Sequence, residues 1–372
     1  MGQLTMDLRG GRFARDVANE EALDIAHALK THFYKPERRL FEEELELEQG
    51  RWKPTTRGRL HSGDSIETFF AFYSIGDKPF CQEYGDLLVD LYVLAGGCSE
   101  PSEALEYAYG NLNPDTSTRH INQARALIMC HTLGRFEETD ELLREIKVQC
   151  YKKEFGLYSS AEVLESGNER SVFNYLFSLH FPVNVAFAVA LHELGKYDER
   201  DQLLETIESH FRAGERYKPS TCHCMSGFLF RDGGNGPDRG YLWAEGRSAD
   251  MAQAQINLGI LYHNLGKEGR ARELFDGLVQ EFYDPEERKI RGENWDLEIN
   301  SQMLAFARAI GEGFIAGELE SALLEGRTSP NLDRKHNLFL HVDGVDNYCN
   351  SWACWNTPAI IALSGNYDKV IF

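Results

Sequence analysis

The strongest constraint on the fold is a repeated pair of helical patterns with a glycine between them. In each pair an apolar segment comes first, and a segment with one charged and one apolar face follows the glycine. The clearest pairs meet at Gly134, Gly195 and Gly266. Glycine at this place supplies the left-handed residue that ends a helix. The pattern predicts helical hairpins, each made of an apolar inner helix and an amphipathic outer helix.

The predicted inner and outer helices are 121–133 with 135–150, 183–194 with 196–211, 250–265 with 267–282, 64–75 with 80–94, and 297–310 with 313–324. One outer helix, 20–33, and one inner helix, 350–363, are left over, and Pro358 must kink the latter or lie in its first turn. Pairing them gives six inner and six outer helices. We therefore predict an all-α (α/α)6 toroid that forms one domain over residues 1–372, with the N-terminal helix closing the ring.

A tetratricopeptide-like solenoid is the alternative fold. Two features of the sequence count against it. The spacing between inner helices is irregular, whereas a solenoid repeats at a fixed period. The long insertions all precede an inner helix, while the turns from inner to outer helix stay short. Loops that all emerge at one face would build a pocket there.

Net charge and hydropathy limit the classes of binding partner expected for this chain. The chain of 372 residues has 39 Lys and Arg against 59 Asp and Glu, a net charge of −20, which disfavours binding to nucleic acid or to anionic membranes. No run of 18 apolar residues is present, and residues 1–7 lack the features of a signal peptide. We expect a cytoplasmic protein with reduced cysteines, a small-molecule substrate and no nucleic-acid or membrane partner, and a homo-oligomer is compatible with this.

The chemistry is expected in the long loops and at the starts of the inner helices, because loops on a rigid scaffold carry most functional side chains. Helix capping is the alternative role for Asp64, Asp250, Asp296 and Asn350. The predicted catalytic residues are Asp64, His120, His223 and Asp296. The predicted substrate-binding residues are His61, Tyr158, His180, Cys222, Trp243, Arg247, Asp250, Trp295, Asn300, His341 and Asp343.

His120 and Asp64 are the best acid–base pair. Such chemistry needs two titratable groups that face one substrate with their pKa values pushed apart. His120 opens an inner helix, and Asp64 opens the inner helix one pair earlier. The alternative for His120 is packing against loop backbone.

A zinc site at Cys222-His223-Cys224, completed by His341 or Cys349, is disfavoured. Adjacent residues chelate one ion poorly, and the sequence has no CxxC or HxxxH spacing. We predict no metal and no cofactor. Cys130 and Cys150 fall in helical patterns and are expected to fill the core.

The run Arg119-His120-Ile121-Asn122 resembles the Gly-His-Leu-Asn motif of the linalool dehydratase-isomerase-like group of (α/α)6 toroid enzymes. The resemblance implies that His120 takes part in acid–base dehydration and isomerisation of an allylic alcohol. The run from Trp243 to Arg247 resembles a tryptophan-containing inner-helix motif of the unsaturated-glycan hydrolases, which share this fold.

Three functions follow as hypotheses. The first is a cofactor-independent lyase, isomerase or cyclase that acts on a small, largely apolar substrate of the terpenoid type in a central pocket lined by aromatic side chains. The second is a carbohydrate-active hydrolase or lyase that uses a pair of aspartates. The third is a non-catalytic helical-repeat scaffold that binds peptides.

Overall fold

The computed structural model describes residues 20–36, 39–41, 44–48, 51–54, 62–94, 116–159, 179–213, 216–217, 249–291, 296–328, 331–343 and 348–365. Its contacts fall into two compact units. The first unit comprises residues 1–88, 103–110 and 279–370, and the second comprises residues 89–102, 111–278 and 371–372. The prediction of a single domain stays a prediction.

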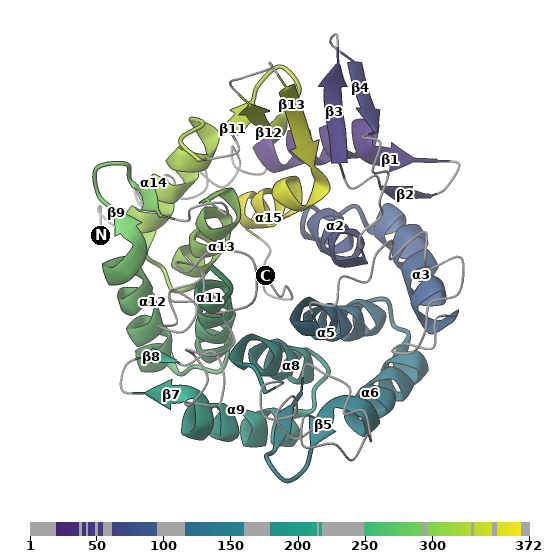
Figure 1. Ribbon diagram of the computed structural model, residues 1–372, viewed down its shortest axis with the longest axis vertical. Helices are drawn as coiled ribbons and strands as arrows, with labels where there is room; N and C mark the ends of the chain where they lie inside the picture. The colour runs from purple at the N-terminus through teal and green to yellow at the C-terminus, as the bar shows by residue number, and fades with distance from the viewer. Residues whose placement is uncertain are drawn as a thin grey trace, which may run out of the picture. The chain divides into compact units, whose positions relative to one another are not determined.

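The second unit is built from helical hairpins, and Figure 1 shows inner helices α5, α8 and α11 beside outer helices α6, α9 and α12. Helix α8 packs against α5 on one side and α11 on the other. The bounds of these helices are α5 Thr116–Thr132, α6 Phe136–Cys150, α8 Phe181–Glu193, α9 Tyr197–Phe211, α11 Ala249–Asn264 and α12 Glu268–Phe282.

The burial of these helices follows their sequence patterns. Helix α8 is apolar on every side, and ten of its thirteen residues are buried. Helix α9 buries one stripe of side chains and carries Asp198 and Glu199 in its first turn, where their negative charges interact favourably with the helix dipole. Cys130 and Cys150 are buried, which confirms their place in the core.

The predicted glycine turns are confirmed. Gly134, Gly195 and Gly266 have φ values of 77°, 70° and 69°. At Gly195 the N–H bonds to the carbonyl of His192 at 3.0 Å, and the N–H of Lys196 bonds to the carbonyl of Leu191 at 2.9 Å. This is the bond pattern of a Schellman motif, and it satisfies carbonyls that the end of the helix leaves open.

The first unit combines helices with a sheet. It includes the helices α2 Ser62–Ser74, α3 Lys78–Leu94, α13 Asp296–Ala309, α14 Gly313–Leu324 and α15 Ala353–Ser364, and α3 runs on past the unit boundary. Helix α15 packs against both α2 and α13, so the first and last inner helices of the chain meet. The helix at 20–33 contacts the α2–α3 turn through an ion pair of 3.2 Å between Lys30 and Asp77. It contacts the hairpin at 331–343 through an ion pair between Glu21 and Arg334.

A five-stranded antiparallel sheet pairs strands near the N-terminal end of the described chain with strands near its C-terminal end. Its strand order is β11-β12-β13-β3-β4, and β13 pairs with β3 so that Asn350 lies opposite Glu46. The bounds are β3 Glu44–Glu48, β4 Arg51–Pro54, β11 Asn331–Asp333, β12 Leu338–Asp343 and β13 Tyr348–Trp352. The expectation that Asn350 begins or caps the last inner helix was wrong, because residues 348–352 pair as a strand and α15 begins at Ala353.

Hairpins whose strands are only two residues long follow several outer helices, in segments that the sequence pattern assigned to helix ends and loops. They are β1 Tyr34–Lys35 with β2 Leu40–Phe41, β5 Tyr151–Lys152 with β6 Leu157–Tyr158, β7 Arg212–Ala213 with β8 Arg216–Tyr217, and β9 Tyr283–Asp284 with β10 Lys289–Ile290. Strands this short show no alternating pattern, and their partners lie only a few residues away. Among the described residues, no helix is both long and apolar enough to cross a membrane.

Candidate functional site

Five of the predicted polar residues lie at or near the N-terminal ends of their own inner helices. Asp64 is the third residue of α2, and His120 is the fifth of α5. Asp250 is the second residue of α11, Asp296 is the first of α13, and His180 is the N-cap of α8. The glycine turns lie at the other ends of these helices. Asp64 and Asp250 therefore lie inside the first turn instead of at the N-cap position.

The second unit brings three of these positions onto neighbouring helices. His120, His180 and Asp250 belong to α5, α8 and α11, and α8 packs against the other two. Asp64 and Asp296 belong to the first unit, where α2 and α13 both pack against α15. The pairing of Asp64 with His120 would join residues of different units, and it stays a prediction.

Other predicted residues lie on the sheet or outside the described chain. His341 and Asp343 are on β12, and His341 is paired with Asn350. Asn350 is paired with Glu46, and Glu46 with Lys53, so four polar residues form one row across four strands. The predicted residues that lie outside the described ranges are His61, Cys222, His223, Trp243, Arg247 and Trp295. Among the described residues, no group of three or more His, Cys, Asp and Glu could hold a metal ion.

His180 has the best-defined surroundings of the predicted titratable residues. Its backbone is extended, with φ −102° and ψ 140°, and Pro182 follows in the first turn of α8, where proline favours a helix start. Its carbonyl accepts hydrogen bonds from the backbone N–H of Asn184 at 3.3 Å and from the side-chain Nδ2 of Asn184 at 2.8 Å. The residue is half-buried. A histidine held by its backbone and partly open to solvent is suited to proton transfer near neutral pH.

Tyr158 makes structural contacts with α8, and its predicted contact with substrate stays a prediction. Its N–H donates to Oδ1 of Asn184 at 2.7 Å, and its carbonyl accepts from Nδ2 of Asn184 at 3.0 Å. Its ring is 1% exposed and stacks on Phe187 with ring centroids 4.1 Å apart. Burial raises the pKa of Tyr158 well above the usual value of 10, so the phenol stays neutral.

The side-chain amide of Asn300 likewise bonds to backbone groups, and its predicted contact with substrate stays a prediction. Its Oδ1 accepts from the N–H of Ile290 at 2.8 Å, and its Nδ2 donates to the carbonyl of Ile290 at 2.9 Å. The side chain is fully buried. A buried amide that brackets one residue of the preceding hairpin stabilises the backbone there.

Polar side chains inside the inner helices were not singled out from the sequence. Arg125 of α5 is 7% exposed, and its Nη1 donates to Oδ1 of Asn122 at 3.3 Å. The hydroxyl of Thr357 on α15 donates to Glu67 of α2 at 3.4 Å. The signal that could have found them is a charged or amide residue one or two turns into an otherwise apolar helix, since such groups are rarely buried without a partner.

No protein-family model and no curated protein matches the sequence. Solved structures match over nearly the whole chain. A D-mannose isomerase matches with a TM-score of 0.59 and 12% identity, covering 95% of this chain and 98% of its own. An α-1,6-mannanase of Salegentibacter has a TM-score of 0.53 and 11% identity, covering 94% and 98%. A possible member of the GH105 family from Salmonella enterica has a TM-score of 0.52 and 9% identity, covering 94% and 93%.

These likenesses define the class of fold. The chain has the all-α (α/α)6 toroid fold, which confirms the fold predicted from the paired helical pattern. The sequence identities of 9–12% extend the likeness to the fold alone.

Proposed function

We propose that the protein is a cofactor-independent acid–base isomerase whose substrate is a small carbohydrate. His120, His180 and Asp250 are the proposed acid–base groups. The observation that carries the proposal is their placement at the N-terminal ends of three inner helices, of which α8 packs against the other two. One histidine can accept a proton and return it near neutral pH, and a second titratable group allows proton transfer on both sides of a substrate.

The reaction class follows from what such groups can do. Interconversion of an aldose and a ketose requires removal of the proton on C2, return of a proton to C1, and a proton shift between the two oxygens. His180 is proposed as the group that removes and returns the carbon-bound proton. His120 or Asp250 then moves the proton between the oxygens. Each group is expected to contribute about 10²- to 10⁴-fold to the rate.

Carbohydrate is preferred over an apolar substrate because of the similar structures. The solved structures with TM-scores of 0.5 or more include a D-mannose isomerase and an α-1,6-mannanase. The terpenoid substrate of the first hypothesis has no comparable support. The resemblance to the linalool dehydratase-isomerase-like group is limited to the short run around His120.

A carbohydrate hydrolase that uses two carboxylates is the second candidate. Asp64 and Asp296 lie in the first turns of α2 and α13, and both helices pack against α15. Two carboxylates on opposite sides of a glycosidic bond would serve as acid and as base or nucleophile.

The test incubates the purified protein with three separate probes. These are D-mannose in D2O, α-1,6-mannobiose and linalool, followed by NMR for the first two and by gas chromatography for the third. The proposal expects loss of the mannose H2 signal and appearance of a ketose. His180→Gln should lower this turnover by about 10²- to 10⁴-fold. His210→Gln, on the exposed face of outer helix α9, is the matched control and should keep it.

The outcomes separate the candidates. Release of mannose from the disaccharide without isomerisation would support the hydrolase, and loss of that activity in Asp64→Asn and Asp296→Asn would assign the carboxylates. Conversion of linalool alone would support the apolar substrate. An unchanged turnover in His180→Gln would overturn the role of His180.

A further inference from the structure

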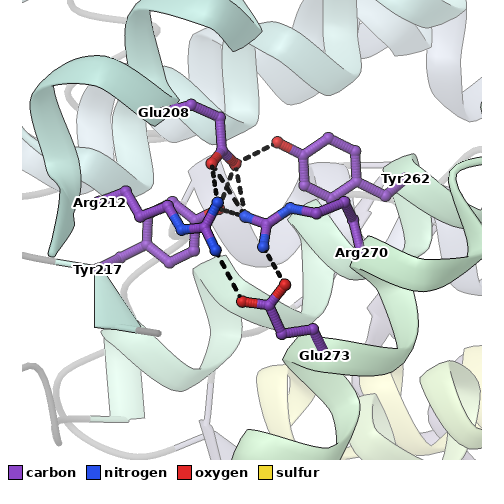
Figure 2. A network of polar contacts seen from close by, with 6 residues as sticks. All are labelled: Glu208, Arg212, Tyr217, Tyr262, Arg270 and Glu273. Carbon is purple, nitrogen blue, oxygen red and sulfur yellow. Dashed lines mark hydrogen bonds and ion pairs between the residues drawn. The ribbon is translucent and has the colours of Figure 1, made fainter. Parts of the chain in front are cut away.

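A network of charged and phenolic side chains joins five elements of the second unit. Figure 2 shows Glu208 of α9 at its centre. Oε1 of Glu208 accepts hydrogen bonds from the hydroxyls of Tyr217 on β8 and Tyr262 on α11. Nη2 of Arg270 on α12 donates to both carboxylate oxygens, at 3.0 and 2.9 Å. These three residues bring donors to the carboxylate from three elements, and Arg212 of β7 adds a donor from a fourth.

A second carboxylate completes the charge balance. Glu273 pairs with Arg270 and, at 2.9 Å, with Arg212 at the start of β7. Arg212 also lies 3.4 Å from Glu208. Two cations and two anions meet at sites where the charged side chains are 24–36% exposed. Several charges in one network at partly buried sites hold their geometry better than an isolated surface pair.

Tyr217 connects this network to the N-terminal end of α8. Its hydroxyl donates to Glu208 and accepts from Nη2 of Arg270 at 2.8 Å. Its side chain is 3% exposed, and its ring stacks on Phe181 with centroids 4.7 Å apart and planes 24° apart. Phe181 is the first residue of α8, directly after His180.

Tyr262 has the same polar contact but a different place. Its hydroxyl also donates to Oε1 of Glu208, and its side chain is 2% exposed. It lies near the C-terminal end of α11, and the ring contacts recorded for it are to the cations of Lys267 and Arg270. The two tyrosines therefore form a natural matched pair.

We propose that Glu208 and Tyr217 are positioning residues for His180. Glu208 and Arg270 fix the Tyr217 hydroxyl, and the Tyr217 ring packs on Phe181. Phe181 in turn fixes the position of the neighbouring N-cap residue, His180. Asn184 stabilises the same end of the helix through hydrogen bonds to the backbone of Tyr158 and to the His180 carbonyl. A displacement of about 1 Å in such a group can cost about 100-fold in rate. The proposal rests on the proposed role of His180 in proton transfer.

The test compares Tyr217→Phe with Tyr262→Phe. Each substitution removes one hydroxyl from Oε1 of Glu208, so both should lower the melting temperature by a similar amount. With D-mannose as the probe, we expect kcat of Tyr217→Phe to fall by about 10-fold or more with KM nearly unchanged. Tyr262→Phe should keep the kcat of the unmodified protein. Equal kcat losses in both variants would reduce the network to a stabilising role and overturn the proposal.

A readout without turnover separates this proposal from the proposed function. The imidazole carbon–proton NMR signal of His180, assigned by its loss in His180→Gln, is followed through a pH titration. Tyr217→Phe should move this signal or its midpoint, and Tyr262→Phe should leave both in place. Phe181→Leu keeps the polar network and removes the stacked ring, so it should reproduce the change. Unmoved signals in Tyr217→Phe and Phe181→Leu would overturn the positioning role, whether or not D-mannose is a substrate.

Discussion

The side-chain amide of Asn184 brackets both backbone groups of Tyr158, which lies 26 residues earlier in the chain. Asn300 does the same for Ile290 in the first unit. Asn356 extends the pattern, because its Oδ1 accepts from the N–H of Phe339 while Ser351 bonds the carbonyl of Phe339. In each case, the side-chain amide of an Asn on an inner helix bonds the backbone of one residue in a preceding strand. This contact fixes the position of the helix relative to that strand without a long sheet.

Replacement of Asn184 should be costly. Asn184→Ala leaves the N–H and the carbonyl of Tyr158 buried without these partners, and each unmet group costs about 1–3 kcal/mol. We expect the free energy of unfolding in urea to fall by about 2–4 kcal/mol. Gln82→Ala, which removes an exposed contact with Asp86, is the control and should change it by less than about 0.5 kcal/mol. A loss as small as that of the control would contradict a stabilising role for the hydrogen bonds between Asn184 and Tyr158.

The stability supplied by Glu208 should depend on pH. Burial alone raises the pKa of Glu208, but the hydrogen bonds from Tyr217, Tyr262 and Arg270 outweigh it and hold the pKa below 4.5. A carboxyl group with a lowered folded pKa stabilises the protein above its unfolded pKa, and this contribution is lost as the pH falls through the folded value. Glu208→Gln should therefore reduce the free energy of unfolding by about 2–3 kcal/mol near neutral pH.

Urea unfolding of both proteins at a series of pH values provides the check. The difference between them should stay constant down to about pH 5 and then shrink as the pH falls further. A difference that stays constant far below that pH would show that Glu208 contributes through packing instead of charge.

Cys81 and Cys130 should resist alkylation in the folded protein. Burial raises the pKa of each thiol to about 12, and the thiolate is the reactive form. Treatment with iodoacetamide near pH 8, followed by peptide mass spectrometry, should leave both unmodified until guanidinium unfolds the chain. Rapid modification of Cys130 in the absence of denaturant would show that α5 opens locally.

The helix pairs could be predicted because their signals are local. Gly195 needs a positive φ at the end of an apolar helix, and most of the charged residues that follow lie on the solvent-facing side of α9. The short hairpins could not be predicted from an alternation of apolar and polar residues, because strands of two residues are too short to show one. A weaker signal was present in the repeated Tyr34-Lys35, Tyr151-Lys152 and Tyr283-Asp284, each at the end of an outer helix.

The site could be predicted only in part. The loops enter at the N-terminal ends of the inner helices, so the pattern that locates the helices also locates His180 and Asp250. The roles of Tyr158 and Asn300 could not be predicted, because their hydrogen bonds depend on which strand packs against which helix. The same holds for Glu208, whose partners lie up to 62 residues away. An amide or a carboxyl group in a sequence does not reveal whether backbone or substrate will use it.

The last prediction concerns His120 and Asp64, which the sequence marked as the best acid–base pair. The proposed isomerase uses His120 but not Asp64, so His120→Ala should lower turnover of D-mannose by about 10²- to 10⁴-fold, and Asp64→Asn should lower it as much only if the predicted pair acts together. The melting temperature should change little, because Asp64 is the third residue of α2 and His120 the fifth of α5, ahead of the apolar middle of each helix. If the two act as a unit, the double variant should lose hardly more than the single variants, since coupled catalytic groups are not additive. Additive losses would assign His120 and Asp64 to separate steps. Variants that melt several degrees lower but keep their specific activity would give both residues a structural role near the starts of their helices and leave the proton transfer to His180.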